Sequence, residues 1–227
     1  LHLWHEAKLS ASRRGLPYDG GMIDSAIHRV APGAPVDVAN IATAFDAGLS
    51  RDRGEAMFRK LRRKLVKLQE KLYADGGQSL LVVFQAMDAA GKDSTIRNVL
   101  GPVNPQGCHV ASFKAPSTLE RSHDFLWRIH KQVPRRGMIG VFNRSHYEDV
   151  LVVRVKSLVP EHIWRPRYEQ INAFERLLHA GGTRVVKFFR HISKDYQKER
   201  LQRRLDRPDK HWKFNPDDLA ERARWGD

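Results

Sequence analysis

The stretch that decides the fold is residues 82–95, which read Val82-Val83-Phe84-Gln85-Ala86-Met87-Asp88-Ala89-Ala90-Gly91-Lys92-Asp93-Ser94-Thr95. An apolar strand runs into a turn of small residues, and Gly91-Lys92 opens a predicted helix. This is the layout of a phosphate-binding P-loop, in which backbone N–H groups and a lysine surround phosphoryl oxygens. Two positions depart from the usual pattern, with Ala86 in place of glycine and Asp93 in place of Ser or Thr. The stretch predicts phosphate binding or phosphoryl transfer.

Two carboxylates, Asp88 and Asp93, flank the lysine of this loop. Beside bound phosphates they are unfavourable unless a divalent cation lies between the charges, and Mg²⁺ prefers such oxygen ligands. The alternative is structural, with Asp88 capping the turn and Asp93 complementing the positive end of the helix. The sequence favours a metal role for Asp88 and leaves both interpretations open for Asp93.

The composition points to an anionic partner. The chain has 227 residues, with 40 Lys and Arg against 26 Asp and Glu, and a net charge of +14. This excess favours nucleic acid, an acidic membrane surface or a phosphate polymer. No apolar run is long enough for a transmembrane helix, and no signal peptide is visible. The single cysteine, Cys108, suits a reducing compartment, and the histidines lack zinc-site spacing. We therefore expect a cytoplasmic location and no membrane partner.

A three-layer α/β fold is predicted from residue 51 onward, after an irregular arm at residues 1–50. Strands are expected at residues 79–84, 108–113, 138–142 and 184–189. Helices are expected from Asp52 onward and at residues 92–100, 117–132, 146–155, 161–179 and 193–205, with a last one starting at Asn215-Pro216. Asp52 with Glu55 and Ser117 with Glu120 resemble capping pairs. Repeated strand–helix units imply a parallel sheet between helical layers.

The first predicted helix has two contrasting faces. Its apolar stripe consists of Met57, Leu61, Leu65, Leu68 and Leu72. Its basic face consists of Arg59, Lys60, Arg62, Arg63, Lys64 and Lys67. We interpret the basic face as a solvated surface, with the lining of a basic groove as the alternative.

A polar cluster follows the third predicted strand and reads Asn143-Arg144-Ser145-His146-Tyr147-Glu148-Asp149. In open parallel sheets ligands bind at the carboxyl ends of the strands, so this cluster should lie beside the P-loop. Glu148 or Asp149 could supply the acidic group near a metal, and Arg144 could stabilise a transferring phosphoryl group. The structural alternative has Asn143 and Ser145 capping a helix, with Arg144 paired to an acidic neighbour.

A third element is basic. Residues 200–214 contain four arginines, two lysines and a tryptophan. In small-molecule kinases such a segment closes over the phosphates and excludes water. The alternatives are a nucleic-acid contact, with Trp212 stacking on a base, and a plain charged loop.

Together these stretches resemble the family-2 polyphosphate kinases from about residue 32 to residue 227. The motifs that carry the resemblance are residues 87–93, residues 142–151 and the stretch Asp209-Lys210-His211-Trp212-Lys213-Phe214. The resemblance implies a P-loop kinase fold related to thymidylate kinase, with a helical lid at about residues 194–215. It also implies Mg²⁺-dependent transfer of a terminal phosphoryl group between inorganic polyphosphate and a nucleotide. Family members commonly continue past Trp225 with another strand and helix, so we expect the C-terminal end to be incomplete.

The candidate site residues follow from the motifs and from the resemblance. The predicted catalytic residues are Asp88, Lys92 and Arg144. The predicted phosphate- or nucleotide-binding residues are Ala89, Ala90, Gly91, Lys92, Asp93, Ser94, Thr95, Asn143, Arg144, Glu148, Arg204 and Lys210. The predicted metal ligands are Asp88, Asp149 and Glu148.

Residues 146–151 resemble the third class of this family, which phosphorylates both nucleoside mono- and diphosphates. The resemblance implies reversible transfer between polyphosphate and AMP, ADP and ATP, with guanine nucleotides as further acceptors. Mg²⁺ is the expected cofactor with Mn²⁺ as a substitute, and a homo-oligomer is expected. The alternatives are an ATP-dependent nucleotide kinase and a basic nucleic-acid-binding protein whose P-loop is incidental.

Overall fold

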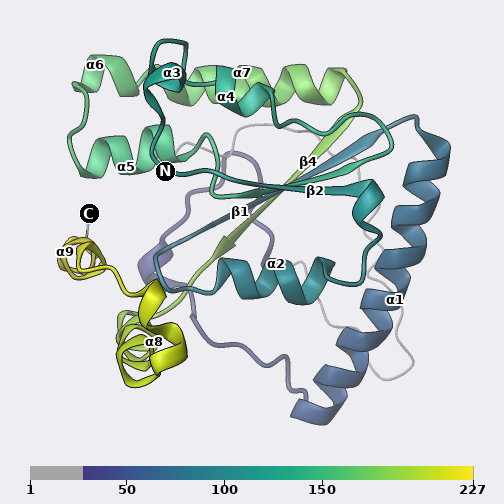
Figure 1. Ribbon diagram of the computed structural model, residues 1–227, viewed down its shortest axis with the longest axis horizontal. Coiled ribbons are helices and arrows are strands. Elements are labelled where there is room, and N and C mark those ends of the chain that lie inside the picture. Colours follow the sequence, from purple (N-terminus) through teal and green to yellow (C-terminus); the bar gives the residue numbers. More distant parts are fainter. Residues whose placement is uncertain (1–27, 227) are drawn as a thin grey trace.

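A four-stranded parallel sheet forms the centre of the protein in a computed structural model that describes residues 28–226 (Figure 1). Its strands are β1 (Ser79–Ala86), β2 (Cys108–Ser112), β3 (Ile139–Asn143) and β4 (Thr183–Arg190). They lie in the order β2-β3-β1-β4, and every neighbouring pair is parallel. The predicted α/β fold with a parallel sheet is therefore confirmed. The carboxyl ends of β1, β3 and β4 all reach one edge of the sheet.

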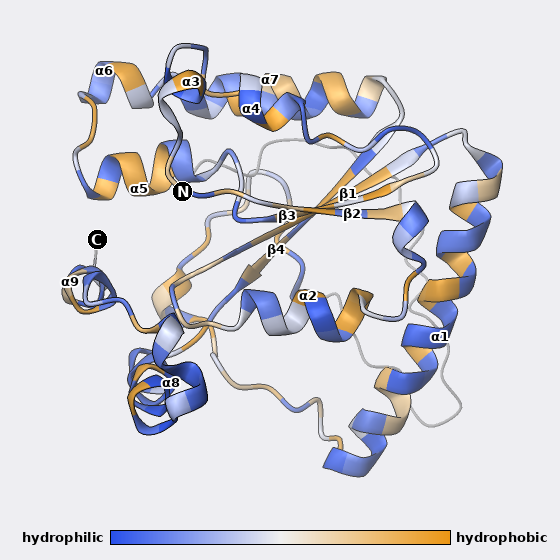
Figure 2. Ribbon diagram, viewed as in Figure 1, coloured by the Kyte–Doolittle hydropathy of each residue, from blue (hydrophilic) through white to orange (hydrophobic). Residues whose placement is uncertain are grey.

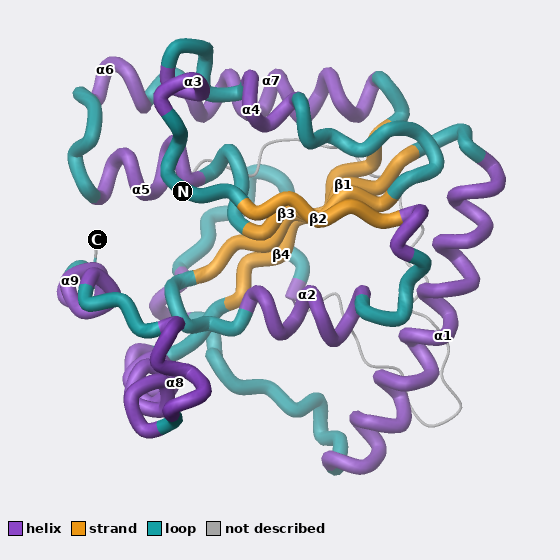
Figure 3. The backbone as a smooth tube through the Cα atoms, viewed as in Figure 1, coloured by secondary structure: helices purple, strands orange, loops and turns teal. Residues whose placement is uncertain are grey.

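Helices cover both faces of this sheet (Figures 1 and 3). The longer ones are α1 (Arg51–Asp75), α2 (Lys92–Leu100), α5 (Glu148–Val155), α7 (Arg167–Ala180) and α8 (Lys194–Asp206). The shorter ones are α3 (Thr118–Arg121), α4 (Trp127–His130), α6 (Glu161–Trp164), α9 (Asp217–Ala223) and the 3-10 turns η2 (Val38–Asn40), η3 (Pro105–Gly107) and η4 (Pro208–Lys213). Among the described residues, no helix is both long and apolar enough to cross a bilayer.

Two hydrophobic clusters hold the helices to the sheet. Successive side chains of a strand point to opposite faces, so Leu81 and Val83 of β1 join the cluster beneath α4, α5 and α7. Val82 and Phe84 join the other cluster with Ile96 of α2. Figure 2 shows this as apolar colour concentrated on the strands and on the inner sides of the helices. β1 therefore packs against helices on both faces, and this packing fixes the position at which the P-loop follows the strand.

Two predicted helices are broken in the structure. The one expected at residues 117–132 forms as α3 and α4, although the predicted capping box of Ser117 and Glu120 is present. The break coincides with Asp124, whose side chain accepts from Leu126 N at 2.9 Å and so competes with helical bonding. The one expected at residues 161–179 divides into α6 and α7 at Pro166, which lacks an N–H and restricts the residue before it.

The first helix differs from its prediction in cap and in buried face. Its N-cap is Ser50 rather than Asp52. Leu61 and Leu68, both expected in the buried stripe, are 43% and 51% exposed, whereas Gln69 is buried. A Cβ on Gly107 would lie 1.8 Å from Gln69 Nε2, so η3 packs directly over this side chain. Of the predicted stripe, Met57, Leu65 and Leu72 are partly buried.

The irregular arm expected at residues 1–50 lies partly outside the described residues, which begin at residue 28. Between there and α1 the chain forms turns and the short helix η2.

Candidate functional site

The P-loop and the polar cluster after β3 meet at the carboxyl edge of the sheet. Arg144 N donates to Phe84 O at 3.1 Å, which joins the two segments through the backbone. Ala89 and Arg144 have positive φ angles of 61° and 63°. Residues other than glycine adopt such angles rarely, and they concentrate at binding and catalytic sites. Both are predicted site residues.

Gly91 is the position of closest approach in the loop. Its φ is +90°, and a Cβ there would lie 3.1 Å from Ser94 Oγ and 3.7 Å from both Arg190 Nε and Arg200 Nη2. A side chain would therefore meet α2 and two guanidinium groups at once. Ser94 and Thr95 donate their hydroxyls to Gly91 O, which secures the start of α2.

The ammonium group of Lys92 folds back over the loop. Its Nζ donates to Ala86 O at 2.9 Å. Burial lowers the pKa of Lys92, and the nearby charge of Arg144 lowers it further, whereas the charge of Asp88 acts in the opposite direction. A partly buried cation that bonds only neutral carbonyl oxygens is available to an incoming anion.

Asp88 lies among cations and one further carboxyl group. Arg144 Nη2 donates to Asp88 Oδ1 at 3.0 Å. Burial acts to raise the pKa of Asp88, but the hydrogen bond with Glu221 and the charges of Arg144, Lys92 and Arg204 lower it overall. The same hydrogen bond and burial raise the pKa of Glu221. The shared hydrogen bond therefore favours the charged form of Asp88 and disfavours the charged form of Glu221.

Two side-chain contacts bind the polar cluster to the P-loop strand and helix. Asn143 Nδ2 donates to Asp93 Oδ1 at 2.7 Å, which links β3 to the first turn of α2. Gln85 Nε2 donates to Glu148 Oε1 at 3.1 Å, which links β1 to α5. The structure thus brings together the predicted residues of both motifs, with one exception.

The exception is Asp149, whose carboxylate contacts two arginines outside the P-loop. Its side chain is 12% exposed, and its carboxylate lies 3.5 Å from Arg128 Nη2 and 3.7 Å from Arg167 Nη1. Burial raises the pKa of Asp149 although both arginines act to lower it. In this arrangement Asp149 neutralises two protein cations, and its partners are these arginines rather than the P-loop residues.

Helices α8 and α9 pack against the loop and cover it. Gln197 of α8 is 3% exposed, and its Nε2 donates to Asp88 O at 3.0 Å. Arg204 donates to Asp218 Oδ2 at 2.7 Å, and its charge contributes to the low pKa of Asp88. Lys210 is held by Asp209 at 3.1 Å. Of the two predicted lid cations, Arg204 therefore acts electrostatically on the loop.

Three residues near the loop were missed by the sequence prediction. Arg190 donates to Ala90 O and, at 3.3 Å, to Thr95 Oγ1. It ends β4, so the rule that ligands gather at carboxyl strand ends could have found it. Arg200 belongs to the basic segment at residues 200–214 that was expected to close over the phosphates, although it was not chosen as a site residue. Gln197 lies inside α8, and no pattern in the sequence distinguishes it from the other polar residues of that helix.

A buried polar network supports the cluster from behind. Glu175 of α7 accepts hydrogen bonds from Tyr147 Oη and Lys187 Nζ, both at 2.6 Å, and contacts His146 Nε2 at 3.3 Å. Burial would raise the pKa of Glu175, but the contact with His146 and the charge of Lys187 lower it to about 2. The network fixes the two residues that precede Glu148.

The carboxylate oxygens of Asp88 are of the kind that binds a divalent cation. In phosphotransferases Mg²⁺ is typically held by one or two carboxylates, with substrate phosphates and water completing the shell. An ionised, partly exposed carboxylate beside the P-loop lysine meets that need. The described residues contain no group of three or more His, Cys, Asp or Glu that could enclose a metal by themselves.

Several named proteins are similar to this chain in sequence. The polyphosphate kinase 2 (PPK2) family matches residues 48–227. An AMP/ADP-polyphosphate phosphotransferase from Meiothermus ruber is 59% identical over 165 residues, which cover 73% of this chain and 62% of that protein. An ADP-polyphosphate phosphotransferase from Rhodopseudomonas palustris is 48% identical over 212 residues, which cover 88% of this chain and 73% of that protein. The chain thus matches less than two thirds of the length of the Meiothermus relative.

A solved structure agrees with the sequence matches. The crystal structure of polyphosphate kinase 2 from Arthrobacter aurescens TC1 superposes with a TM-score of 0.83 at 46% identity, covering 88% of this chain and 72% of that one. Fold, site geometry and relatives all point the same way, and the chain belongs to the polyphosphate kinase 2 family.

Proposed function

We propose that this chain transfers the terminal phosphoryl group of inorganic polyphosphate to AMP and ADP, reversibly and with a divalent cation. The observation that carries the proposal is the arrangement at the sheet edge. Lys92, the ionised Asp88 and Arg144 converge there beneath the cover formed by α8 and α9. The names of the relatives, which include both AMP and ADP as substrates, support the choice of acceptors.

The proposed roles follow from charge and position. Lys92 and the N–H groups at the start of α2 hold the donor phosphates, whose charge favours a helix N-terminus. Arg144, Arg190 and Arg204 neutralise the phosphoryl group as it passes between donor and acceptor. Asp88 holds Mg²⁺, or Mn²⁺ as a substitute, and the ion supplies further neutralisation of phosphate charge. The attacking oxygen belongs to an ionised phosphate, so the site needs no strong general base.

We assign the two acidic residues of α5 to different tasks. Glu148, oriented by Gln85, stays near Lys92 and faces the phosphates and the metal. Asp149 anchors the start of α5 through Arg128 and Arg167, so it positions the cluster without reaching the ion.

Both acceptors are compatible with a site of this kind. Serving AMP and ADP requires the acceptor phosphates to shift by one unit while the donor end stays fixed. The electrostatic field of several arginines and lysines tolerates that shift, because it stabilises phosphate charge at more than one position along the site. AMP supplied with polyphosphate should therefore give ADP first and ATP later.

The direct test is to incubate the full protein with Mg²⁺, polyphosphate and either ADP or AMP, and to follow nucleotides by ion-exchange chromatography. ATP from ADP, and ADP followed by ATP from AMP, support the proposal. An ATP-dependent nucleotide kinase would instead convert AMP and ATP to ADP without polyphosphate. If polyphosphate adds nothing under any condition, the proposal fails.

The homo-oligomer expected from the sequence stays a prediction, which light scattering of the purified protein measures.

A further inference from the structure

Helix α1 carries a row of cations that the site does not use. Between Glu55 and Glu70 it has six basic residues and no acidic one. Arg59, Arg63, Lys67 and Lys71 follow one another at intervals of four residues, so they lie on one side of the helix. The segment from Arg63 to Lys71 spans about 12 Å along the helix axis.

Four of these basic residues have no acidic partner among the described residues. Arg59 approaches Glu55 at 3.7 Å. Across residues 28–226, however, no acidic side chain pairs with Arg63, Lys64, Lys67 or Lys71, and all four are exposed. Like charges four residues apart destabilise a helix, whereas surface helices usually alternate the sign of their charges. A row of this kind is best explained by an anion from outside.

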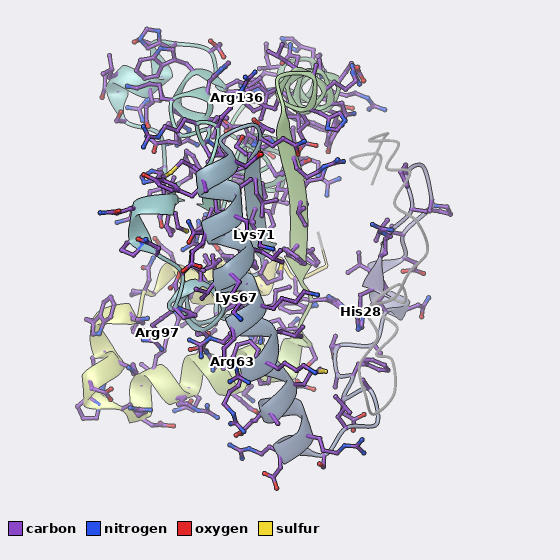
Figure 4. All side chains as sticks on the ribbon, turned by 90° about the vertical axis from the view of Figure 1, so that its right-hand side faces the viewer. His28, Arg63, Lys67, Lys71, Arg97 and Arg136 are labelled. Atoms are coloured by element: carbon purple, nitrogen blue, oxygen red, sulfur yellow. The ribbon has the colours of Figure 1, made fainter. Side chains whose placement is uncertain are left out.

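Two cations from other elements extend the row. Figure 4 looks onto α1 and shows Arg136 beyond its C-terminal end and Arg97 of α2 beside it. A Cβ on Gly137 would lie 3.3 Å from Tyr73 O, which places the loop of Arg136 against the last turns of α1. Leu72 of α1 packs on the same cluster as Ile96 of α2, beside Arg97. Arg97 and Arg136 are also exposed and unpaired among the described residues. We call Arg63, Lys67, Lys71, Arg97 and Arg136 the α1 row.

The α1 row is separate from the site but connected to it. Figure 1 shows α1 on the opposite side of the molecule from α8, with α2 running between them. Because α2 begins at Lys92 and carries Arg97 about 8 Å further along its axis, a long anion on the row has a path toward the P-loop.

We infer that the α1 row is an outlying docking surface for the body of a long polyphosphate chain, whose end enters the P-loop site. This inference rests on the proposed function for its choice of polymer. Polyphosphate is the favoured polymer because all five members of the row are ammonium or guanidinium groups, which bind phosphate without contacting a base. The two exposed aromatic residues of this helix, Phe58 and Tyr73, are not members of the row, and the guanidinium of Arg62 lies over the ring of Phe58 at 5.5 Å. Single-stranded nucleic acids gain much of their affinity from stacking on such rings.

The test compares two variants with the same loss of charge. Arg63→Gln/Lys67→Gln/Lys71→Gln removes three members of the row and keeps good helix formers. Arg121→Gln/Arg165→Gln/Arg176→Gln removes three exposed cations from the helical layer that contains α3, α6 and α7. With ADP as acceptor, the KM for a polymer of several hundred phosphates should rise about tenfold in the first variant alone. The KM for linear tetrapolyphosphate and the kcat should match the parent in both variants.

A binding experiment separates the row from catalysis. Without a nucleotide acceptor no transfer takes place, so in a Lys92→Ala background the binding of long polyphosphate is followed by fluorescence anisotropy across a range of salt concentrations. Loss of three phosphate contacts should reduce the slope of log K against log salt by about 2, using the value of about 0.7 per contact for a single-stranded polyanion. The charge-matched control should keep the slope of its parent.

Several outcomes overturn the inference. The row has no docking role if both triple variants lose the same affinity for long polyphosphate. It also has none if the KM for long polyphosphate and the KM for tetrapolyphosphate rise by the same factor in the first variant. It serves another polymer if single-stranded DNA displaces polyphosphate at equal phosphate concentration and shows the larger loss in the first variant. If the parent binds long polyphosphate through the row but never transfers phosphate, the proposed function fails while the inference stands.

Discussion

Two regions at the carboxyl edge of the sheet treat their carboxylates in opposite ways. In the loop after β1, Asp88 is ionised beside Arg144 and partly exposed, and its pKa is lowered overall. Behind α5, Asp149 and Glu175 are already neutralised by protein cations, Asp149 by two arginines and Glu175 by Lys187. The first region keeps charge available for substrate and metal, whereas the second uses its charges to hold the first in place. Substitutions in the two regions should therefore separate into losses of rate and losses of stability.

The largest effect is expected in the loop. Lys92→Ala and Asp88→Asn should each lower the rate of transfer by about a hundredfold or more, because a charged contact to the transferring group contributes about 3 kcal/mol. Initial rates with ADP and polyphosphate measure this effect. Circular dichroism and the melting temperature should match the parent. Near-parental turnover in a correctly folded variant would remove the loop from the chemistry.

The next effect is one of stability and depends on pH. Glu175→Gln leaves Lys187 buried without its anion and should cost about 3 kcal/mol at pH 7. The pKa of Glu175 is lowered from 4.5 to about 2 on folding. Its contribution is therefore fully present above pH 4.5 and is lost as the pH falls through 2. Urea unfolding at pH 7 and pH 3 should show a gap between parent and variant that narrows in acid.

The matched control for that experiment is Glu169→Gln on the same helix. Glu169 pairs with Arg176 on the surface, where both side chains are more than half exposed. Such pairs contribute about 0–1 kcal/mol. If the difference in unfolding free energy between the parent and Glu175→Gln is the same at pH 7 and pH 3, the charge of Glu175 does not stabilise the fold.

A smaller effect distinguishes the two acidic residues of α5. Asp149→Asn should destabilise the protein by about 2 kcal/mol, since Arg128 loses its buried anion. It should leave the Mg²⁺ dependence of the rate unchanged. Glu148→Gln should instead raise the Mg²⁺ concentration needed for half-maximal rate. If the parent and both variants need the same Mg²⁺ concentration, Glu148 has only a structural role. If Asp149→Asn raises the Mg²⁺ concentration needed, the assignment of Asp149 as a structural residue is wrong.

The smallest effect concerns the contact between α8 and the loop. Gln197→Ala removes the hydrogen bond to Asp88 O and should cost about 1 kcal/mol, a few-fold in kcat/KM. Gln202→Ala is the control, because Gln202 bonds Asp206 on the exposed side of the same helix. Equal kinetics for the two variants would mean that the cover docks without this bond.

Much of the fold could be predicted from the sequence, because local patterns carry it. The strands, the start of α2 at Lys92 and the capping box at Ser117 follow from apolar runs and short polar motifs. The orientation of Asp149 could not be predicted. Adjacent residues on a helix point about 100° apart. A rotation of α5 by that angle would therefore exchange the positions of Glu148 and Asp149, and the sequence does not fix this rotation. The buried face of α1 was missed for a similar reason, since packing against Gly107 decided it.

The docking of α9 has a consequence for how the cover opens. Its residues make three contacts with two other elements: Glu221 pairs with Lys156 after α5, whereas Arg222 and Asp218 contact Gln197 and Arg204 of α8. Freeing the loop therefore means breaking several contacts together rather than one after another. Such an assembly behaves as a single cooperative unit. Amide hydrogens of α8 and α9 should then exchange with solvent at a common rate, and Asp218→Asn should accelerate both helices equally.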